Sequence, residues 1–298
     1  MILPLPARIG FARAARIPCV AGLFETAALQ LRVAKRLAPR RGASLGERLG
    51  KLDERLVFVV GSPRSGTTFL ANAIGSLPGF VDLGEVPPLK AAVPELVDLP
   101  APEAARRLRR ILTVARRVGL VGAVRAVEQT PELAHLVDVV QDAYPAARIV
   151  HIVRDGRDVA CSLLEKPWLR PRQTQSDDAG VAYGAYARFW VEPERRDEFE
   201  HVSDARRAAW AWRRYVSAAR AASAPLIEVR YERMAEEPRE VARELAESLD
   251  APVDALATAL GPVHDASVGR HRRDLDEEQL ADVLAEAGDL LAELGFLR

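Results

Sequence analysis

A glycine-rich stretch in the first quarter of the chain carries the residue types that bind a phosphate. The sequence LVFVVGSPRSGTTFLANAIG, residues 56–75, places an apolar run before two glycines and a hydroxyl pair. Glycines let the backbone curl so that successive N–H groups point inward, and a helix that begins there turns its positive end to the same spot. Thr67 and Thr68 add hydroxyl donors, and Arg64 adds a planar fork that suits a tetrahedral oxyanion. The stretch therefore predicts a loop that binds a phosphate-like anion.

This loop differs from the nucleotide-binding P-loop at a decisive position. That P-loop reads G-x-x-x-x-G-K-[ST], and its lysine holds the β- and γ-phosphates. Here Thr67 follows Gly66, and Arg64 is the only cation of the loop. An ATP-dependent small-molecule kinase with a degenerate P-loop is one alternative. The missing lysine argues against it, as does the lack of an apolar strand that ends in a magnesium-type aspartate pair.

A second stretch, IVRDGRDVACSLL at residues 152–164, repeats the architecture of the first. Arg154 leaves the end of an apolar run, and Ser162 lies two turns into the following helical segment. Ligands of open α/β sheets bind at the carboxyl ends of the strands, so both side chains can face the first loop. An arginine and a serine suit a second phosphate, although the charged run between them also allows a structural ion-pair cluster and helix cap.

The elements that must position these residues follow from the periodicity of the sequence. Short β-branched apolar runs at 55–60 and 147–153 predict buried strands, and residues 225–234 predict a third strand that runs into a turn. Strand–turn–helix units in series predict an α/β fold with a central parallel sheet flanked by helices. The segments with helical spacing are 67–77, 102–118, 130–144, 156–166, 205–222, 238–249 and 276–294.

The chain of 298 residues is long enough for one large domain or two small ones. We expect one main domain at residues 51–298 and a helical extension at residues 1–50, with a polar linker over 43–55. The extension is basic and partly amphipathic, which also admits weak contact with a membrane surface. Residues 167–205 are irregular and hold scattered aromatics, so they predict a functional loop or lid.

Composition restricts the partners of the chain. The formal net charge is +0, so a bulk basic field for nucleic acid is absent and any anion site is local. Two cysteines are too few for a disulfide framework. No apolar stretch approaches the roughly 20 residues that span a bilayer. Together these features predict a cytoplasmic protein.

The two phosphate-binding stretches together resemble the sulfotransferase family that uses 3′-phosphoadenosine-5′-phosphosulfate (PAPS). Their spelling, GSPRSGTTFL and RIVHIVRDGRDVACSLL, is similar to the branch that contains tyrosylprotein sulfotransferases and many bacterial relatives. The resemblance implies a P-loop-like sulfotransferase fold, PAPS as sulfuryl donor, 3′,5′-diphosphoadenosine (PAP) as product, and no metal. It implies that the first loop binds the 5′-phosphosulfate and the second the 3′-phosphate.

Two further segments extend the resemblance. VRYERM is similar to the family's third-strand segment, which implies that Tyr231 lies near the adenine. SVGRHRRDL, residues 267–275, is similar to a C-terminal loop that closes over the 3′-phosphate. The cofactor-binding residues that the resemblance implies are Arg64, Ser65, Gly66, Thr67, Thr68, Phe69, Arg154, Ser162, Tyr231, Gly269 and Arg272.

The resemblance also implies the chemistry. The family transfers the sulfuryl group in line to a hydroxyl, here of a small-molecule, sugar or lipid acceptor. Gly84-Glu85 resembles the element that supplies the catalytic glutamate of the tyrosylprotein branch, so Glu85 is the expected base and Arg64 a stabiliser of the transition state. Asp82 and His135 are poorer candidates for the base.

Two positions depart from the family pattern. Gln129 in EQTP stands where many bacterial relatives have lysine, and His271 stands where tryptophan is usual. They support a second alternative, a catalytically weak or non-catalytic nucleotide-binding relative.

Overall fold

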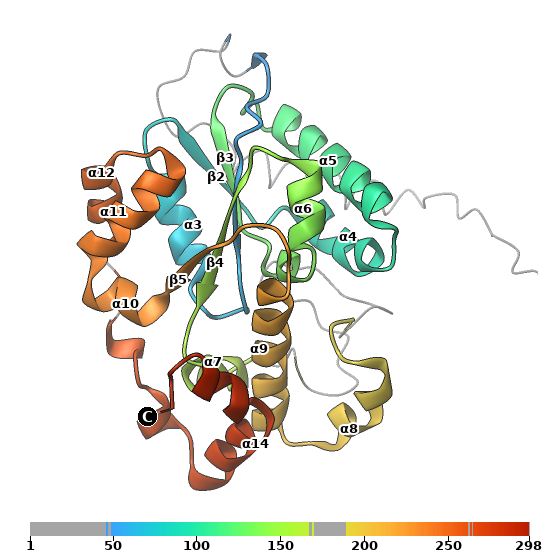
Figure 1. The fold of residues 1–298 in the computed structure, drawn as a ribbon, viewed down its shortest axis with the longest axis vertical. Helices are drawn as coiled ribbons and strands as arrows, with labels where there is room; N and C mark the ends of the chain where they lie inside the picture. Colours follow the sequence, from blue (N-terminus) through green and yellow to red (C-terminus); the bar gives the residue numbers. More distant parts are fainter. Residues whose placement is uncertain are drawn as a thin grey trace, which may run out of the picture.

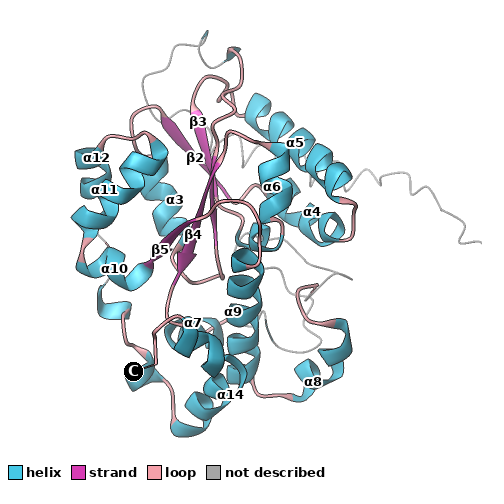
Figure 2. Cartoon of the chain, viewed as in Figure 1, coloured by secondary structure: helices cyan, strands magenta, loops and turns pink. Residues whose placement is uncertain are grey.

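The computed structural model describes residues 46, 49–166, 169, 189–261, 263 and 265–297. Within this part of the chain, five strands form one parallel sheet in the order β2-β3-β1-β4-β5, and helices cover both of its faces (Figures 1 and 2). The predicted α/β fold with a central parallel sheet is confirmed. The strands are β1 (Val57–Val60), β2 (Phe80–Gly84), β3 (Arg125–Glu128), β4 (Arg148–Val153) and β5 (Ile227–Arg230).

The helices connect these strands and close the C-terminal half of the described chain. No helix in the described part is both long and apolar enough to cross a membrane. The α-helices are α3 (Thr67–Gly75), α4 (Pro87–Val97), α5 (Ala101–Val118), α6 (Val137–Ala143), α7 (Gly156–Leu164), α8 (Arg196–His201), α9 (Asp204–Arg220), α10 (Tyr231–Glu236), α11 (Pro238–Leu249), α12 (Val253–Leu260), α13 (His271–Asp274) and α14 (Glu277–Glu293). The 3₁₀ turns of the described part are η1 (Pro131–His135), η4 (Pro193–Arg195) and η5 (Asp265–Ser267).

Burial on both faces explains why β1 is an unbroken apolar run. Phe58 and Val60 pack in one hydrophobic cluster, which also holds buried residues of α5, α6, α9 and α14. Val57 and Val59 pack in the other, with residues of α3, α11 and α12. Successive side chains of a strand point to opposite faces, so a strand covered on both sides is apolar throughout.

Several predicted elements differ from the structure. β2 and β3 were not predicted, and they add two strands to the three that were. The predicted helix over 130–144 is divided at Leu136 into η1 and α6. The predicted third strand within 225–234 is β5, and the helix α10 follows it in place of the predicted turn.

Two predicted regions lie largely outside the described residues. Of the predicted extension at residues 1–50, only 46, 49 and 50 are described. Of the predicted loop or lid at 167–205, residues 167–168 and 170–188 lie outside the described part. The remainder, from Phe189 on, contains η4, α8 and the start of α9.

The parallel sheet brings five chain segments to one edge. The carboxyl end of β1 leads into the first glycine-rich loop and that of β4 into Arg154. The carboxyl ends of β2, β3 and β5 lead into Glu85, Gln129 and Tyr231. Every strand therefore ends in a residue or loop that the sequence singled out.

Candidate active site

The loop between β1 and α3 has a backbone shaped to expose its N–H groups. Arg64 and Gly66 have φ angles of 71° and 98°, in the left-handed region. Gly66 is the N-cap of α3, and no side chain caps this helix. Its first amide groups are thus oriented toward the loop, where an anion is stabilised by them and by the helix dipole.

Ser65 adds an observation that points to a ligand. Its side chain is fully buried, and its Oγ has no hydrogen-bond partner among the described residues. A buried hydroxyl without a partner costs about 1–3 kcal/mol. A bound oxyanion would supply the missing acceptor, so the loop fits a phosphate or sulfate group.

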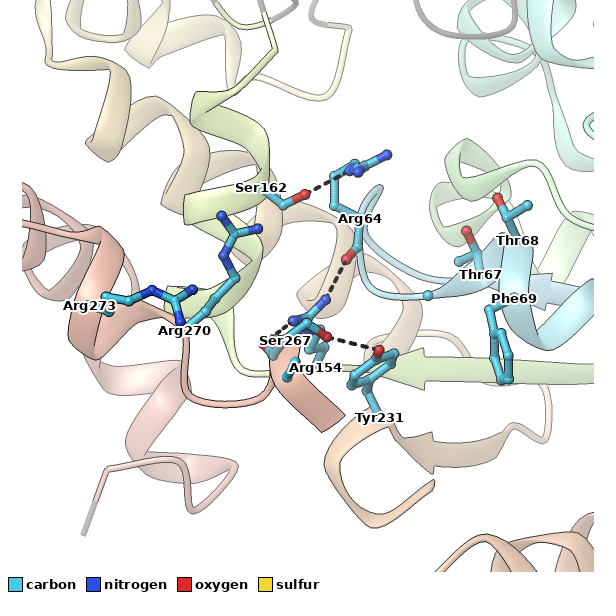
Figure 3. A pocket seen from close by; sticks show the side chains of 12 residues that line it. Arg64, Thr67, Thr68, Phe69, Arg154, Ser162, Tyr231, Ser267, Arg270 and Arg273 are labelled. Atoms are coloured by element: carbon cyan, nitrogen blue, oxygen red, sulfur yellow. Dashed lines mark hydrogen bonds between the residues drawn. The ribbon is translucent and has the colours of Figure 1, made fainter. Parts of the chain in front are cut away.

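Side-chain and backbone contacts join the two loops. Arg64 donates from Nε to Ser162 Oγ over 2.9 Å, and Arg154 donates from Nη1 to the Arg64 carbonyl over 3.4 Å (Figure 3). Arg154 is buried, with 6% of its surface exposed. Two motifs separated by 90 residues therefore form one site, as the predicted pairing requires.

The site is a cavity of about 530 Å³, a size suited to a nucleotide-sized ligand. In Figure 3 the threonines of α3 lie on one side of it, and Arg270 and Arg273 lie on the other. Its lining includes eight of the predicted cofactor-binding residues, Arg64, Gly66, Thr67, Thr68, Phe69, Arg154, Ser162 and Tyr231, together with Ala266, Ser267, Arg270 and Arg273.

Tyr231 packs its ring against the loop and against Arg154. The Arg154 guanidinium carbon lies 4.4 Å from the ring centroid, and the Tyr231 hydroxyl lies 3.0 Å from Ser267 Oγ. A Cβ at Gly66 would lie 2.8 Å from Tyr231 Cδ2, so only glycine fits there. Both its φ angle and this close approach explain the glycine.

The C-terminal loop is attached to α7 by a buried carboxylate. Asp158 is fully buried and accepts hydrogen bonds from the Gly269 and His271 amides over 2.6 and 3.0 Å, while His271 Nδ1 lies 2.7 Å from it. Burial by itself would raise the pKa of Asp158, but these hydrogen bonds together lower it. His271, in place of tryptophan, therefore fixes the loop by hydrogen bonding.

The same loop presents two arginines that were not predicted. Arg270 and Arg273 line the cavity, whereas Arg272 and Gly269 do not. Arg272 is exposed. Residues three apart share a face of a helical turn, so the spacing of Arg270 and Arg273 around α13 was a signal that could have identified them. Ser267, which contacts Tyr231 and accepts from Arg154 through its carbonyl, carried no such signal.

Glu85 lies outside the lining of this cavity, in the turn between β2 and α4. Its Oε2 is 2.5 Å from Lys90 Nζ. The turn is connected to the start of α3 through Gln129, whose backbone amide donates to the Gly84 carbonyl over 3.2 Å and whose Oε1 accepts from the Thr68 hydroxyl over 3.3 Å. Gln129 therefore links the turn after β2 to α3 by hydrogen bonds, and it brings no charge.

The poorer candidates for the base have other roles. Asp82 Oδ1 accepts from the Gly84 amide over 2.8 Å and so shapes the turn. The His135 ring packs edge-on against Phe189 and Tyr215. Burial lowers the pKa of His135 to about 3, as expected for a neutral core histidine.

Comparison with known proteins gives one family match. The model of the sulfotransferase family matches residues 99–255, which include the second loop and Tyr231 but neither the first loop nor α13. A comparison with curated protein sequences finds no match.

Several solved structures are similar in fold. The sulfotransferase domain from the curacin biosynthetic pathway is 14% identical, with 83% of this chain and 99% of that chain covered and a TM-score of 0.48. A sulfotransferase from Alicyclobacillus acidocaldarius is 19% identical, with 82% and 95% covered and a TM-score of 0.47. Mouse sulfotransferase SULT7A1 complexed with PAP is 17% identical, with 84% and 93% covered and a TM-score of 0.45.

The family match extends over more than half of the chain and includes Arg154, Ser162 and Tyr231 of the cavity. The chain belongs to the sulfotransferase family.

Proposed function

We propose that this sulfotransferase moves the sulfuryl group of PAPS to a hydroxyl of a small-molecule, glycan or lipid acceptor. The observation that supports the donor is the convergence of two anion-binding loops on one cavity. PAPS carries anionic groups at both its 5′ and 3′ positions, and the cavity has cationic or N–H-rich groups at both ends. A cytoplasmic location and the likeness to the tyrosylprotein branch remain predictions from the sequence.

The residues divide naturally between the two anions. We assign the phosphosulfate to the loop of Arg64, Ser65 and Gly66 and to the start of α3. We assign the 3′-phosphate to Arg154 and Ser162, with Arg270 and Arg273 of the C-terminal loop beside them. Tyr231 would lie against the adenine, and Gly269 and Arg272 would shape the loop rather than contact the nucleotide.

The proposed reaction is an in-line displacement at sulfur. The acceptor oxygen forms a bond to sulfur while the bond between sulfur and the bridging phosphate oxygen breaks, and PAP leaves. Negative charge develops on that bridging oxygen, where Arg64 and the hydroxyls of Thr67 and Thr68 would stabilise it. Glu85 would accept the proton of the acceptor hydroxyl.

Ligand-induced stabilisation tests the donor assignment. We expect PAP at 100 times its Kd to stabilise the protein by about 2.7 kcal/mol, without magnesium. Arg64→Ala and Arg154→Ala should lose most of this effect. Arg243→Ala, which removes an exposed arginine of α11 far in sequence from both loops, is the matched control and should keep it.

The same measurement with magnesium-ATP separates the alternatives. Stabilisation by magnesium-ATP and not by PAP would show that the loop belongs to a kinase. Stabilisation by neither would favour a relative that has lost nucleotide binding. Stabilisation by PAP, followed by no turnover over a panel of hydroxyl acceptors, would favour the catalytically weak relative.

A further inference from the structure

A buried lysine contacts two carboxylates beside the turn that carries Glu85. Lys90 Nζ lies 2.5 Å from Glu85 Oε2 and 3.5 Å from Glu132 Oε1. Lys90 and Glu132 are buried, with 4% and 1% of their surfaces exposed, while the Glu85 side chain is 19% exposed. The three groups come from α4, from η1 and from the turn after β2.

The count of charges in this cluster matters for proton transfer. A buried ammonium that loses its counter-ion is strongly destabilised. If Glu85 were the only partner of Lys90, protonation of Glu85 would leave the lysine in that state, and the proton affinity of Glu85 would be very low. Because Glu132 also contacts Lys90, a neutral ion pair remains when Glu85 takes up a proton.

We infer that Lys90 and Glu132 are positioning residues for Glu85, which fix its carboxylate on the turn after β2 and let it accept a proton during turnover. This inference rests on the proposed role of Glu85 as the base. The acceptor hydroxyl gives its proton to Glu85 as the oxygen–sulfur bond forms. The proton then passes to water, since Glu85 is the one partly exposed member of the cluster.

The place of Glu85 relative to the loop supports this arrangement. Gln129 joins the Gly84 carbonyl to the Thr68 hydroxyl, so the turn and the start of α3 are separated by one bridging residue. The ion pair with Lys90 then fixes the Glu85 side chain on that turn.

Other acidic groups also surround Glu85. Lys90 on α4, Glu132 on η1 and Glu128 at the end of β3 are charged groups of this cluster, and Asp82 precedes Glu85 on β2. Glu128 is fully buried and repels the charge of Glu85. Glu132 thus offsets the effect of the single ammonium, and Glu128 adds to this effect only where it is ionised, above about pH 7.

The titration of Glu85 tests the inference without an acceptor. We would label glutamate carboxyl carbons with ¹³C and follow them by NMR against pH, with Glu85→Gln to assign the signal. Removing an opposite charge within about 4–6 Å shifts a carboxyl pKa by about 1–3 units. Lys90→Met should therefore raise the pKa of Glu85 by about 1 unit or more. Glu132→Gln should lower the pKa of Glu85, because it removes a negative charge from the cluster.

Opposite shifts of the Glu85 pKa distinguish this role from simple packing, because loss of packing would not change that pKa in different directions in the two variants. If Lys90→Met does not fold, Lys90→Arg and the double variant Lys90→Met/Glu132→Gln replace it. Lys90→Arg should titrate as the wild type, and the double variant between the two extremes. A Glu85 titration unchanged in Glu132→Gln would overturn the inference.

Failure of the proposed function has a different signature. PAP stabilisation in the same variants reports on the donor site, and loss of turnover in Glu85→Gln reports on the base. If the protein does not bind PAP but the pKa of Glu85 shifts in opposite directions in the two variants, the charge arrangement is supported and the proposed function is wrong. If the protein binds PAP but the pKa of Glu85 does not shift in the variants, the donor site is supported and the inference about Lys90 and Glu132 is wrong.

Discussion

Glu128 shows how the site places a carboxylate in a dry environment. It is fully buried at the end of β3, and it accepts hydrogen bonds from the Thr130 amide over 3.0 Å, from the Thr130 hydroxyl over 2.5 Å and from the Val86 amide over 3.4 Å. Burial raises its pKa from 4.5 to about 7, and the hydrogen bonds from Thr130 and Val86 oppose that rise. Glu128 therefore fixes the turn after β2 and titrates near neutral pH.

This titration predicts a pH dependence of stability. Between pH 4.5 and about 7 the folded state holds a proton that the unfolded chain has lost. The free energy of unfolding should therefore fall as pH rises through this window, by about 3 kcal/mol at most. Urea unfolding at several pH values measures the slope. Glu128→Gln should flatten it, whereas Glu103→Gln, an exposed glutamate of α5, should leave it unchanged. An equal slope in the wild type and Glu128→Gln would refute the assignment.

Gly66 gives a second prediction at the scale of one residue. Alanine there would adopt a left-handed φ of 98°, and its Cβ would approach the Tyr231 ring to 2.8 Å. Gly66→Ala should lower the free energy of unfolding by about 1–3 kcal/mol and weaken PAP binding. Gly288→Ala in α14 is the matched control, because nothing lies within 4 Å of its Cβ position and alanine favours helix. Equal effects of the two substitutions would contradict this account.

At the scale of elements, α7 and the C-terminal loop are joined through Asp158 and His271. A hydrogen bond to a buried charged group contributes about 1.5–3 kcal/mol. His271→Ala should loosen the loop that carries Arg270 and Arg273, and should weaken PAP binding about tenfold, which corresponds to about 1.4 kcal/mol. Isothermal titration calorimetry with PAP measures this directly.

The three arginines of this loop provide the control. Arg270→Ala and Arg273→Ala remove charges that line the cavity, and each should weaken PAP binding. Arg272→Ala removes an exposed charge outside the lining and should change binding less than twofold, which is about 0.4 kcal/mol. Weaker binding in Arg272→Ala than in the other two would instead favour the residue that the family resemblance implied.

The same elements show what could be read from the sequence. β1 and β4 could be predicted because apolar side chains fill both faces of a central strand. β3 could not, since the buried Arg125 and Glu128 at its ends read as loop residues. Their burial depends on partners that only the fold supplies, such as the Leu249 carbonyl for Arg125 and the Thr130 groups for Glu128.

The candidate site also contains parts that could be predicted from the sequence and parts that could not. The two loops could be predicted because glycines, hydroxyls and arginines stand at fixed local spacings after strands. The contacts of Lys90 with Glu85 and Glu132 could not, because they depend on how α4 and η1 pack against each other. Motifs formed by residues close in sequence could be predicted, whereas ion pairs between distant elements could not.

At the scale of the whole molecule, we propose that residues 51–298 form the catalytic domain and that residues 1–50 are an N-terminal extension of it. Every candidate residue of the donor site lies between Arg64 and Arg273. A chain of residues 46–298 should therefore bind PAP within about twofold of the full chain, a difference of about 0.4 kcal/mol. It keeps Leu49 and Gly50, whose carbonyls accept from Arg117 of α5.

The same deletion tests the proposed contact with a membrane surface. Residues 1–45 hold several arginines and a single acidic residue, Glu25. Basic segments near an anionic membrane gain about 1 kcal/mol per charge, and salt weakens the attraction. The full chain should thus sediment with vesicles that contain anionic lipid at low salt, and residues 46–298 should not. Vesicles of neutral lipid are the control. Equal sedimentation of both chains would show that the catalytic domain makes the contact, where α5 carries exposed arginines. Loss of PAP binding in the shorter chain would show that residues 1–45 belong to the catalytic domain.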